Sequence, residues 1–513
     1  MKTAVSLLTI LLAQFSADAL SAVTRVETSS MSAYGTFKAG EYNRWELRVF
    51  GELSPQAEAI PDLEKAPRNA NGMVDYSTRV TLLAPSIAAR GNGALLIDIP
   101  NRGRAIASSL YNSPRNVSVP LGSFDPGTGF LQDYGFMVAA VSWELGYGVD
   151  LPSFIGPDGK PRFVEGAALP IVRDVAHFLA SAGTDTAGQR NPIAGATSRT
   201  IGLGYSQTGR FLKSFLLRGF NTVEGRRLFA GMHILGAASG HIVLNSVPGP
   251  NSGAGLIPTF SDPEVRGVNE EPLALAYVAE GSDLSKEAMP RMVFVNTTTD
   301  YFSLRASLGR TGAQGALDRP LPQNIRVYDI AGASHALIAG KGDCKYPYAV
   351  LDWHPLMRST LLALDRWVLA GTNPPPSSLM PLRDSTGDSM ALKAPAHLSQ
   401  AIIQTPVLDQ DGNATGGVRL PDMAAPIGTH AIQNPPLSFL CALGAGYVAF
   451  AKTRAEREAS NDSRLSLMER YNDKRDYLDR IRASTRNLMR IGFLTSDDAA
   501  VIVHAAAEAT ELK

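Results

Sequence analysis

One stretch, IGLGYSQTGRF at positions 201–211, constrains the fold of this chain more than any other. An apolar run enters it and apolar residues at helical spacing leave it, which predicts a buried strand, a tight turn and an amphipathic helix. Ser206 stands at the tip of that turn, and Gly204 and Thr208 are small enough for a strained backbone. Gly209 comes one position later than in the usual G-x-S-x-G pattern. The stretch indicates a nucleophilic serine on a strand-to-helix elbow, with a plain glycine-rich turn as the alternative.

Other apolar runs repeat this alternation of strand and helix along the chain. Expected strands cover 44–53, 74–83, 94–99, 136–141, 228–237, 291–296 and 325–330, and expected helices cover 167–182 and 356–369. Buried strands alternating with amphipathic helices predict an α/β fold, with a mostly parallel central sheet flanked by helices on both faces.

The N-terminal segment has the features of a secretory signal peptide. Met1-Lys2 supplies a positive start, residues 4–13 are apolar but too short to span a bilayer, and A-D-A at 17–19 is a cleavage site, with L-S-A at 20–22 competing. We expect residues 1–22 to be removed and the protein to be exported to the periplasm or outside the cell. An N-terminal core helix is the alternative.

The rest of the chain divides into three expected parts. Residues 23–90 form an N-terminal β-rich part, 91–380 hold the catalytic core, and 381–513 are a loop and helical extension packed on the core. Within the core, 236–287 is rich in Gly, Pro, Ser and Asn. Because ligands bind at the carboxyl edge of open α/β sheets, this insertion is expected to be a lid or substrate-binding segment, with an uninvolved surface loop as the alternative.

Composition narrows the classes of partner. The chain carries 48 Lys+Arg and 48 Asp+Glu, so its formal net charge is zero and nothing favours nucleic acid. After the N-terminal segment no apolar run is long enough for a membrane span. There is no metal-ligand motif and no nucleotide-binding glycine motif, so we expect no cofactor and no metal. The sequence leaves the oligomeric state open.

Two residues, Cys344 and Cys441, are the only cysteines. In an exported protein they are expected to form one disulfide that ties the C-terminal third to the core; two separate buried thiols are the alternative.

A serine needs a base at neutral pH, and His335 is the strongest candidate because it follows the 325–330 strand directly. His354 is its rival. Asp300 directly follows the 291–296 strand and precedes the histidine, which is where a triad acid is expected. The fallback acids are Asp283, Asp329 and Asp352.

An oxyanion hole should use the backbone N–H of Gln207, the residue after the nucleophile. The second donor should come from the loop after the 94–99 strand, at Arg102, Gly103 or Arg104. The side chains of Arg102 and Arg104 could instead contact an acidic group of the substrate or pair with surface carboxylates.

At these residues the chain resembles the α/β-hydrolases, and more narrowly a family of exported bacterial alpha/beta hydrolase domain proteins. The similar pieces are KAPRNANG at 65–72, NRGR at 101–104, GYSQTG at 204–209, TDY at 299–301, AGASH at 331–335, LDRWV at 364–368, GVRLPD at 417–422 and AER at 455–457. The shifted glycine also resembles glucuronoyl esterases and is close to the tannase and feruloyl esterase pattern. Relatives often have Glu at the position of Asp300. Glucuronoyl esterases usually have Cys and Arg at the positions of Tyr205 and Gln207.

The resemblance implies an α/β-hydrolase fold and a serine hydrolase acting on small-molecule or polymer-derived carboxylic esters. The alternatives are a non-catalytic binding protein with the same fold, and a peptidase or acyltransferase using the same triad. Which ester is cleaved is not readable from the sequence.

Overall fold

The computed structural model of the protein describes residues 22–242, 244, 246–248, 289–311, 320–385, 402–436 and 438–509. All but the last residue of the expected signal peptide, and most of the expected lid at 236–287, lie outside the described residues.

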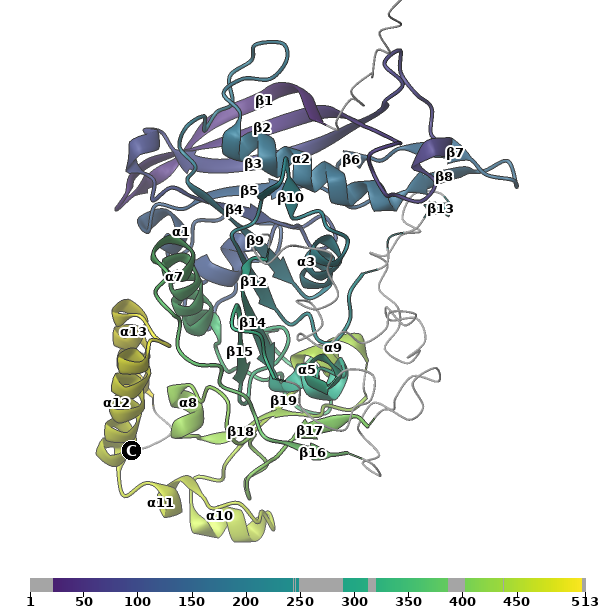
Figure 1. Ribbon diagram of the computed structural model, residues 1–513. Coiled ribbons are helices and arrows are strands. Elements are labelled where there is room, and N and C mark those ends of the chain that lie inside the picture. The colour runs from purple at the N-terminus through teal and green to yellow at the C-terminus, as the bar shows by residue number, and fades with distance from the viewer. Residues whose placement is uncertain are drawn as a thin grey trace, which may run out of the picture.

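A ten-stranded sheet starts at the top of the molecule and ends below its middle in the view of Figure 1. The strands along its main path, in spatial order, are β1 (Ala22–Phe37), β2 (Gly40–Leu53), β3 (Val74–Pro85), β5 (Met137–Val141), β4 (Ala94–Asp98), β9 (Arg199–Tyr205), β12 (Gly231–Leu235), β14 (Arg291–Thr297) and β15 (Ile325–Ile330), while β6 (Val149–Asp150) pairs with β3. From β5 to β15 neighbouring strands are parallel, whereas β1, β2, β3 and β5 pair antiparallel. The mostly parallel sheet predicted from the sequence is confirmed.

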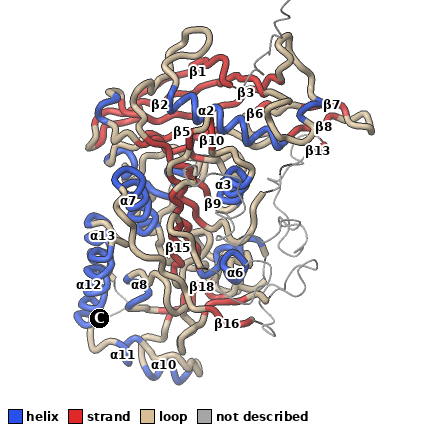
Figure 2. Tube along the Cα trace, in the orientation of Figure 1, coloured by secondary structure: helices blue, strands red, loops and turns tan. Residues whose placement is uncertain are grey.

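Small sheets and helices surround this sheet (Figure 2). The small sheets comprise β7 (Ser153–Ile155), β8 (Pro161–Val164) and β13 (Ser246–Pro248), β10 (Thr222–Val223) and β11 (Arg226–Arg227), β16 (Leu382–Asp384) and β17 (Gln404–Pro406), and β18 (Gly428–Ile432) and β19 (Gly446–Ala449). The described α-helices are α1 (Phe130–Asp133), α2 (Ala168–Ser181), α3 (Gln207–Leu217), α5 (Thr298–Ser303), α6 (Leu308–Thr311), α7 (His354–Ala370), α8 (Pro421–Ala424), α9 (Phe439–Gly444), α10 (Arg454–Ala459), α11 (Leu467–Arg470), α12 (Lys474–Ile491) and α13 (Ser496–Glu508).

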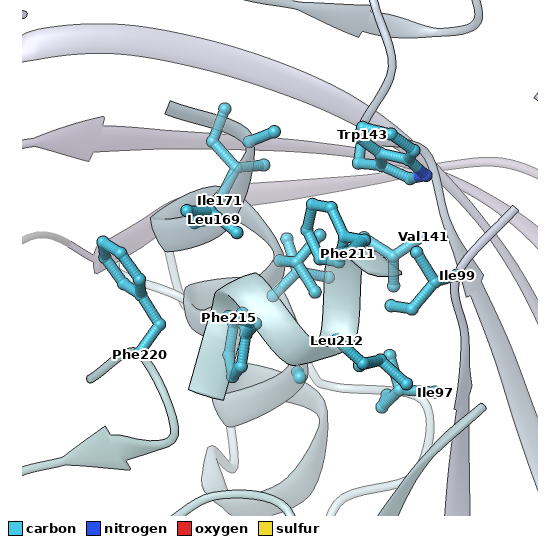
Figure 3. Close-up of a cluster of buried hydrophobic side chains, with 14 of the residues drawn as sticks. Ile97, Ile99, Val141, Trp143, Leu169, Ile171, Phe211, Leu212, Phe215 and Phe220 are labelled. Carbon is cyan, nitrogen blue, oxygen red and sulfur yellow. The ribbon is translucent and has the colours of Figure 1, made fainter. Parts of the chain in front are cut away.

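The apolar strands of the sheet bury both faces, which explains their continuous hydrophobic runs. Ile97 of β4 faces a cluster formed with α2 and α3, and the neighbouring Leu96 faces a second cluster formed with α7, α12 and α13. Figure 3 shows the first cluster, where Phe211 and Phe215 of α3 lie among the side chains of β4, β5 and α2. The two layers of helices therefore fix the central strands from both sides.

The structure differs from the sequence prediction mainly at edges. β1 is a long strand that the sequence did not single out, because much of it is exposed and its residues are mixed in polarity. α7 begins at His354 rather than at residue 356, since Pro355 occupies the first turn, where its missing N–H costs nothing. None of the helices in the described ranges combines the length and apolar character that a membrane crossing needs.

Candidate active site

Ser206 lies on a strained turn between β9 and α3. Its φ of 55° and ψ of −113° are rare for a residue with a side chain, and its N–H donates to the Leu235 carbonyl at 2.8 Å. The turn is tight because a Cβ on Gly204 would lie 2.7 Å from the Cα of Gly209. A Cβ on Gly209 would in turn lie 2.8 Å from that of Ala237, on the segment after β12. The backbone of β9 and the segment after β12 both approach α3 closely at position 209. This explains why the second glycine is at 209 and not at 208.

Thr208 occupies the position where the usual pattern has its second glycine. Its hydroxyl accepts from the Tyr205 N–H at 3.0 Å and donates to the Tyr205 carbonyl at 3.2 Å. Thr208 therefore closes the elbow with its side chain instead of leaving space.

Asp300 and His335 come from the ends of adjacent strands, β14 and β15, and meet in the protein interior. Asp300 Oδ1 lies 2.6 Å from His335 Nδ1, and these residues are 0% and 2% exposed. The other oxygen, Oδ2, accepts from the Thr297 N–H at 2.7 Å, as part of the capping box that starts α5. The carboxylate is thus held on both sides. A carboxylate acceptor keeps the proton on Nδ1, so Nε2 is the basic nitrogen.

The imidazole of His335 lies directly beside the elbow. The Tyr205 ring stacks on it, with centroids 5.2 Å apart and planes tilted by 23°, and the Tyr205 hydroxyl donates to the His335 carbonyl at 2.7 Å. On another side, a Cβ on Gly236 would lie 2.8 Å from the ring, so only glycine fits there. The predicted acid and base therefore lie next to Tyr205, the residue before the predicted nucleophile.

The link between Ser206 and His335 is not closed in this conformation. Within the described part of the chain, the Ser206 hydroxyl forms no hydrogen bond with the imidazole. Catalytic hydrogen bonds are often long or misaligned until substrate is bound. Both a catalytic and a purely structural serine therefore fit this geometry.

The predicted oxyanion residues lie on both sides of the elbow. Gln207 is the first residue of α3, fully buried, at the end of the helix where N–H groups lack helical partners. Residues 101–104 form a tight turn, with positive φ at Arg102 (50°) and Gly103 (71°). The Arg104 N–H donates to the Asn101 carbonyl at 3.1 Å, so this amide is engaged within the turn.

The turn is tied to the elbow by Asn101, a residue that the sequence prediction did not single out. Its Nδ2 donates to the Tyr205 carbonyl at 2.7 Å, while its Oδ1 accepts from Arg102 at 2.8 Å. Burial lowers the pKa of the Arg102 guanidinium, an effect that Glu144 partly offsets. The guanidinium stays charged, because its ordinary pKa is far above neutrality.

Glu144 was also missed by the sequence prediction. It lies three residues after the end of β5, is 6% exposed, and accepts from the Gln207 side chain at 3.1 Å. Burial raises the pKa of its carboxyl, in spite of the Gln207 hydrogen bond, the Arg102 charge and the Gly103 and Arg102 backbones, all of which lower it. The signal that could have found it is its place at the carboxyl edge of the sheet, beside the strand that ends at the turn.

The rival residues are held elsewhere. His354 pairs with Asp352 at the start of α7, at 2.7 Å. Asp329 accepts from Tyr301 at 2.8 Å and from Asn296 at 3.1 Å. Its carboxylate therefore satisfies two buried polar side chains. Asp283, the remaining fallback acid, lies outside the described residues.

The predicted disulfide between Cys344 and Cys441 is present, with Cα atoms 5.6 Å apart. Cys441 lies on α9, whose Ala442 carbonyl accepts from Ser303 of α5 at 2.8 Å. The disulfide therefore ties the segment after His335 to α9, which contacts the helix that carries Asp300 through Ser303. In the ranges described, these two sulfurs and Asp343 form the one grouping of potential metal ligands, and sulfurs bonded to each other are not thiolate ligands.

Comparison with known proteins identifies the family. The sequence model of the alpha/beta hydrolase domain family matches residues 139–504. No curated protein sequence matches the chain. Among solved structures, the glucuronoyl esterase from Solibacter usitatus is 10% identical, with 60% of this chain and 80% of that chain covered and a TM-score of 0.26. The rice cell wall degrading esterase LipA from Xanthomonas oryzae is 10% identical, with 60% of this chain and 90% of that chain covered and a TM-score of 0.28. Acetyl xylan esterase 1 from Thermoanaerobacterium sp. JW/SL YS485 is 10% identical, with 60% of this chain and 80% of that chain covered and a TM-score of 0.27.

Proposed function

Because this chain belongs to the alpha/beta hydrolase domain family, we propose that it is a serine hydrolase that cleaves carboxylic esters. In this proposal Ser206 is the nucleophile, His335 the general base and Asp300 the residue that orients the imidazole. The observation that carries the proposal is the buried contact of 2.6 Å between Asp300 and His335, directly beside the strained elbow. The order of the strands supports it: the acid follows β14 and the histidine follows β15, on one side of the nucleophile strand β9.

The chemistry follows from these positions. Ser206 Oγ attacks the ester carbonyl carbon while His335 Nε2 takes its proton, and the Asp300 carboxylate stabilises the resulting imidazolium. The Gln207 N–H stabilises the oxyanion. In this conformation the Asn101 and Arg104 N–H groups bond within the turn at 101–104, and the Arg102 and Gly103 backbones face Glu144, so the second donor expected there is already engaged. Collapse of the tetrahedral intermediate breaks the ester C–O bond, and the alcohol leaves with the proton from His335. Water, deprotonated by His335, then attacks the acyl-enzyme, and Ser206 leaves with the proton.

The test is the variant Ser206→Ala with a p-nitrophenyl ester. Loss of a serine nucleophile costs on the order of 10⁶ in kcat, so turnover should fall to the background rate while the melting temperature stays near that of the wild type. Ser181→Ala is the matched control, because Ser181 also lies beside a histidine, His177, at 3.4 Å, but is exposed on α2. Wild-type turnover in purified Ser206→Ala would contradict the proposal.

A fluorophosphonate probe separates this proposal from a non-catalytic binding protein. The wild type should gain one covalent label, and the labelled peptide should contain Ser206. Comparing amide with ester substrates, with and without an alcohol acceptor, separates an esterase from a peptidase or acyltransferase. An intact wild-type protein that takes no label would favour the binding protein.

Export is part of the proposal. It rests on the features of residues 1–22 and on the Cys344–Cys441 disulfide, which is typical of oxidising compartments. The mass of the protein recovered from its native compartment should correspond to a chain beginning at Leu20 or Val23. A protein that still begins at Met1 would contradict export by cleavage.

A further inference from the structure

Three adjacent strand ends meet next to the proposed nucleophile, and each is tied to another. β5, β4 and β9 are neighbours in the sheet. Asn101 after β4 donates to the Tyr205 carbonyl at the end of β9, at 2.7 Å. Trp143 after β5 donates from its indole N–H to the Pro100 carbonyl after β4, at 2.8 Å. Glu144 after β5 accepts from the Gln207 side chain after β9, at 3.1 Å.

The segment after β5 is itself rigidly held. The Trp143 ring is 3% exposed and packs on Phe211 of α3, with centroids 4.7 Å apart. Figure 3 shows both rings in the apolar cluster, with Ile99 and Val141 beside them. Moving Glu144 would require moving its neighbour Trp143 out of this cluster, which costs the packing of a large aromatic side chain.

The carboxylate of Glu144 is buried, and burying a charge is expensive unless it is paired and hydrogen-bonded. Among the described residues, the main groups that favour its charged form are the Gln207 side chain, the Arg102 charge and the Arg102 and Gly103 backbones. Its Oε1 accepts from Gln207 at 3.1 Å, whereas its Oε2 is buried with no hydrogen-bond partner in that part of the chain. The first of these groups belongs to Gln207, whose N–H is the expected oxyanion donor. Glu144 therefore links the start of α3 to the turn that follows β4.

We infer that Glu144 is a positioning residue that holds the start of α3, and with it the Gln207 N–H, in a fixed position for the oxyanion. Glu144 acts through this segment and does not touch the reacting atoms. The inference rests on the proposed esterase function of Ser206. Misplacement of donors by about 1 Å is enough to cost about 100-fold in rate, so a residue of this kind has a large effect without being catalytic itself.

Glu144→Gln is the first test, since it keeps the size and removes the charge that its partners stabilise. We expect kcat for a p-nitrophenyl ester to fall about 10- to 100-fold, with KM within about threefold, because an ester binds without needing the oxyanion donors in register. Glu144→Asp keeps the charge but shortens the reach, so its loss should lie between wild type and Glu144→Gln.

Asp174→Asn is the matched control. Asp174 is also a buried carboxyl, on α2, paired with Arg173 at 2.7 Å. Burial raises the pKa of Asp174 to about 7, as burial also raises that of Glu144. Its replacement should leave kcat within about twofold. Equal losses of kcat in Asp174→Asn and Glu144→Gln would show a general effect of removing buried carboxyls and would overturn the inference.

Hydrogen exchange supplies a readout that does not depend on activity. In Glu144→Gln, peptides covering residues 99–107 and 205–210 should exchange faster than in the wild type, while peptides covering β12 and β14 should not change. A fall in kcat without faster exchange, or faster exchange with wild-type kcat, would overturn positioning. If the wild type neither hydrolyses esters nor takes the fluorophosphonate label, the proposed function fails and the positioning role of Glu144 fails with it. Wild-type kcat in Glu144→Gln overturns only the role of Glu144.

Discussion

The molecule contains two buried histidine–aspartate pairs of nearly the same geometry. His335 Nδ1 lies 2.6 Å from Asp300 Oδ1, and His354 Nδ1 lies 2.7 Å from Asp352 Oδ1. All four side chains are almost completely buried. The two pairs are also neighbours, because Trp353 donates from its indole N–H to the Ser334 carbonyl at 3.1 Å.

The pairs differ in what they join. Asp300 and His335 come from two strand ends and lie beside the elbow of Ser206. Asp352 and His354 are two residues apart at the start of α7, where the same Asp352 oxygen also accepts from the His354 N–H at 3.0 Å. The second oxygen of Asp352 accepts from the Asn116 N–H at 3.1 Å. The second pair thus satisfies the donors of a helix start and a loop.

The comparison teaches that a short carboxylate–imidazole contact does not by itself mark a catalytic base. What separates the pairs is the surroundings of the outer nitrogen. In the part of the chain described, His354 Nε2 is buried with no hydrogen-bond partner, whereas the His335 ring lies against Tyr205, next to the proposed nucleophile. Four predictions test this contrast, in order of decreasing effect.

Replacing the two histidines should separate the pairs most clearly. We expect His335→Gln to lower kcat for a p-nitrophenyl ester about 10⁴- to 10⁶-fold, because the proton of Ser206 then has no acceptor. His354→Gln should keep kcat within about threefold. Steady-state kinetics on both purified variants decides this, and a larger loss in His354→Gln would reverse the assignment.

Replacing the two carboxylates should show the same contrast with a smaller effect. Asp300→Asn is expected to cost about 10⁴-fold in kcat, because an amide donor favours the wrong imidazole tautomer. Asp352→Asn should leave kcat near wild type and lower the free energy of unfolding by about 1–3 kcal/mol, since buried donors lose their acceptor. Steady-state kinetics gives kcat and urea unfolding gives the free energy of unfolding of both variants. A kcat loss shared equally by the two would refute the contrast.

The disulfide ties α9 to the segment between the two pairs. The Ala336 N–H, next to His335, donates to the Leu443 carbonyl at 3.3 Å, and the Ala349 N–H, three residues before Asp352, donates to the Gly444 carbonyl at 3.1 Å. The double variant Cys344→Ala/Cys441→Ala should lower the free energy of unfolding by about 2–4 kcal/mol, because the bond closes a loop with a sequence separation of 97. At 25 °C kcat should change little, but on heating the double variant should lose its activity at a lower temperature than the wild type. Unchanged stability in denaturant would show that the packing of α9 suffices alone.

A third buried histidine, His233, hydrogen-bonds two hydroxyls and, among the residues that the structure describes, no carboxylate. Its pH dependence sharpens the contrast. His233 contacts the Tyr111 hydroxyl at 2.7 Å and that of Thr360 at 2.9 Å, and burial lowers its pKa to about 3. The unfolded chain takes up this proton near pH 6.5 and the folded chain only near pH 3, so stability is lost as pH falls below 6.5.

The variant His233→Gln removes that contribution. Between pH 7 and pH 5 the wild type should lose about 2 kcal/mol more unfolding free energy than the variant. Urea unfolding at both pH values measures the difference. Other titrating groups, such as Asp98 with a pKa raised to about 7 by burial, are common to both proteins and largely cancel. Parallel losses would mean that His233 is protonated in the folded state near its usual pKa.

Much of the fold was predictable because it follows from local patterns. Strands buried on both faces must be apolar throughout, so β4, β5, β14 and β15 were expected close to their observed bounds. The elbow was expected because its turn needs small residues at fixed offsets around Ser206. The order of serine, acid and histidine along the chain could also be read directly.

Only part of the choice among partners was readable in the same way. The chain order predicted Asp300 as the partner of His335, and these two side chains do meet. The sequence did not show that the fallback acid Asp352 is paired with the rival His354. Glu144 was passed over because its importance depends on Gln207 and Arg102, which are 63 and 42 positions away. Contacts of this kind depend on which strands are adjacent in the sheet.

The sequence by itself therefore determined the repeating strands and helices, the serine turn and the pairing partners available to two cysteines. Only the tertiary structure decided which strand ends share an edge, that Thr208 closes the elbow, and that one of two similar histidine–aspartate pairs stands beside Ser206. The reason is physical: periodicity and turn chemistry act over a few residues, whereas a site is assembled by packing between segments that the chain brings together from far apart.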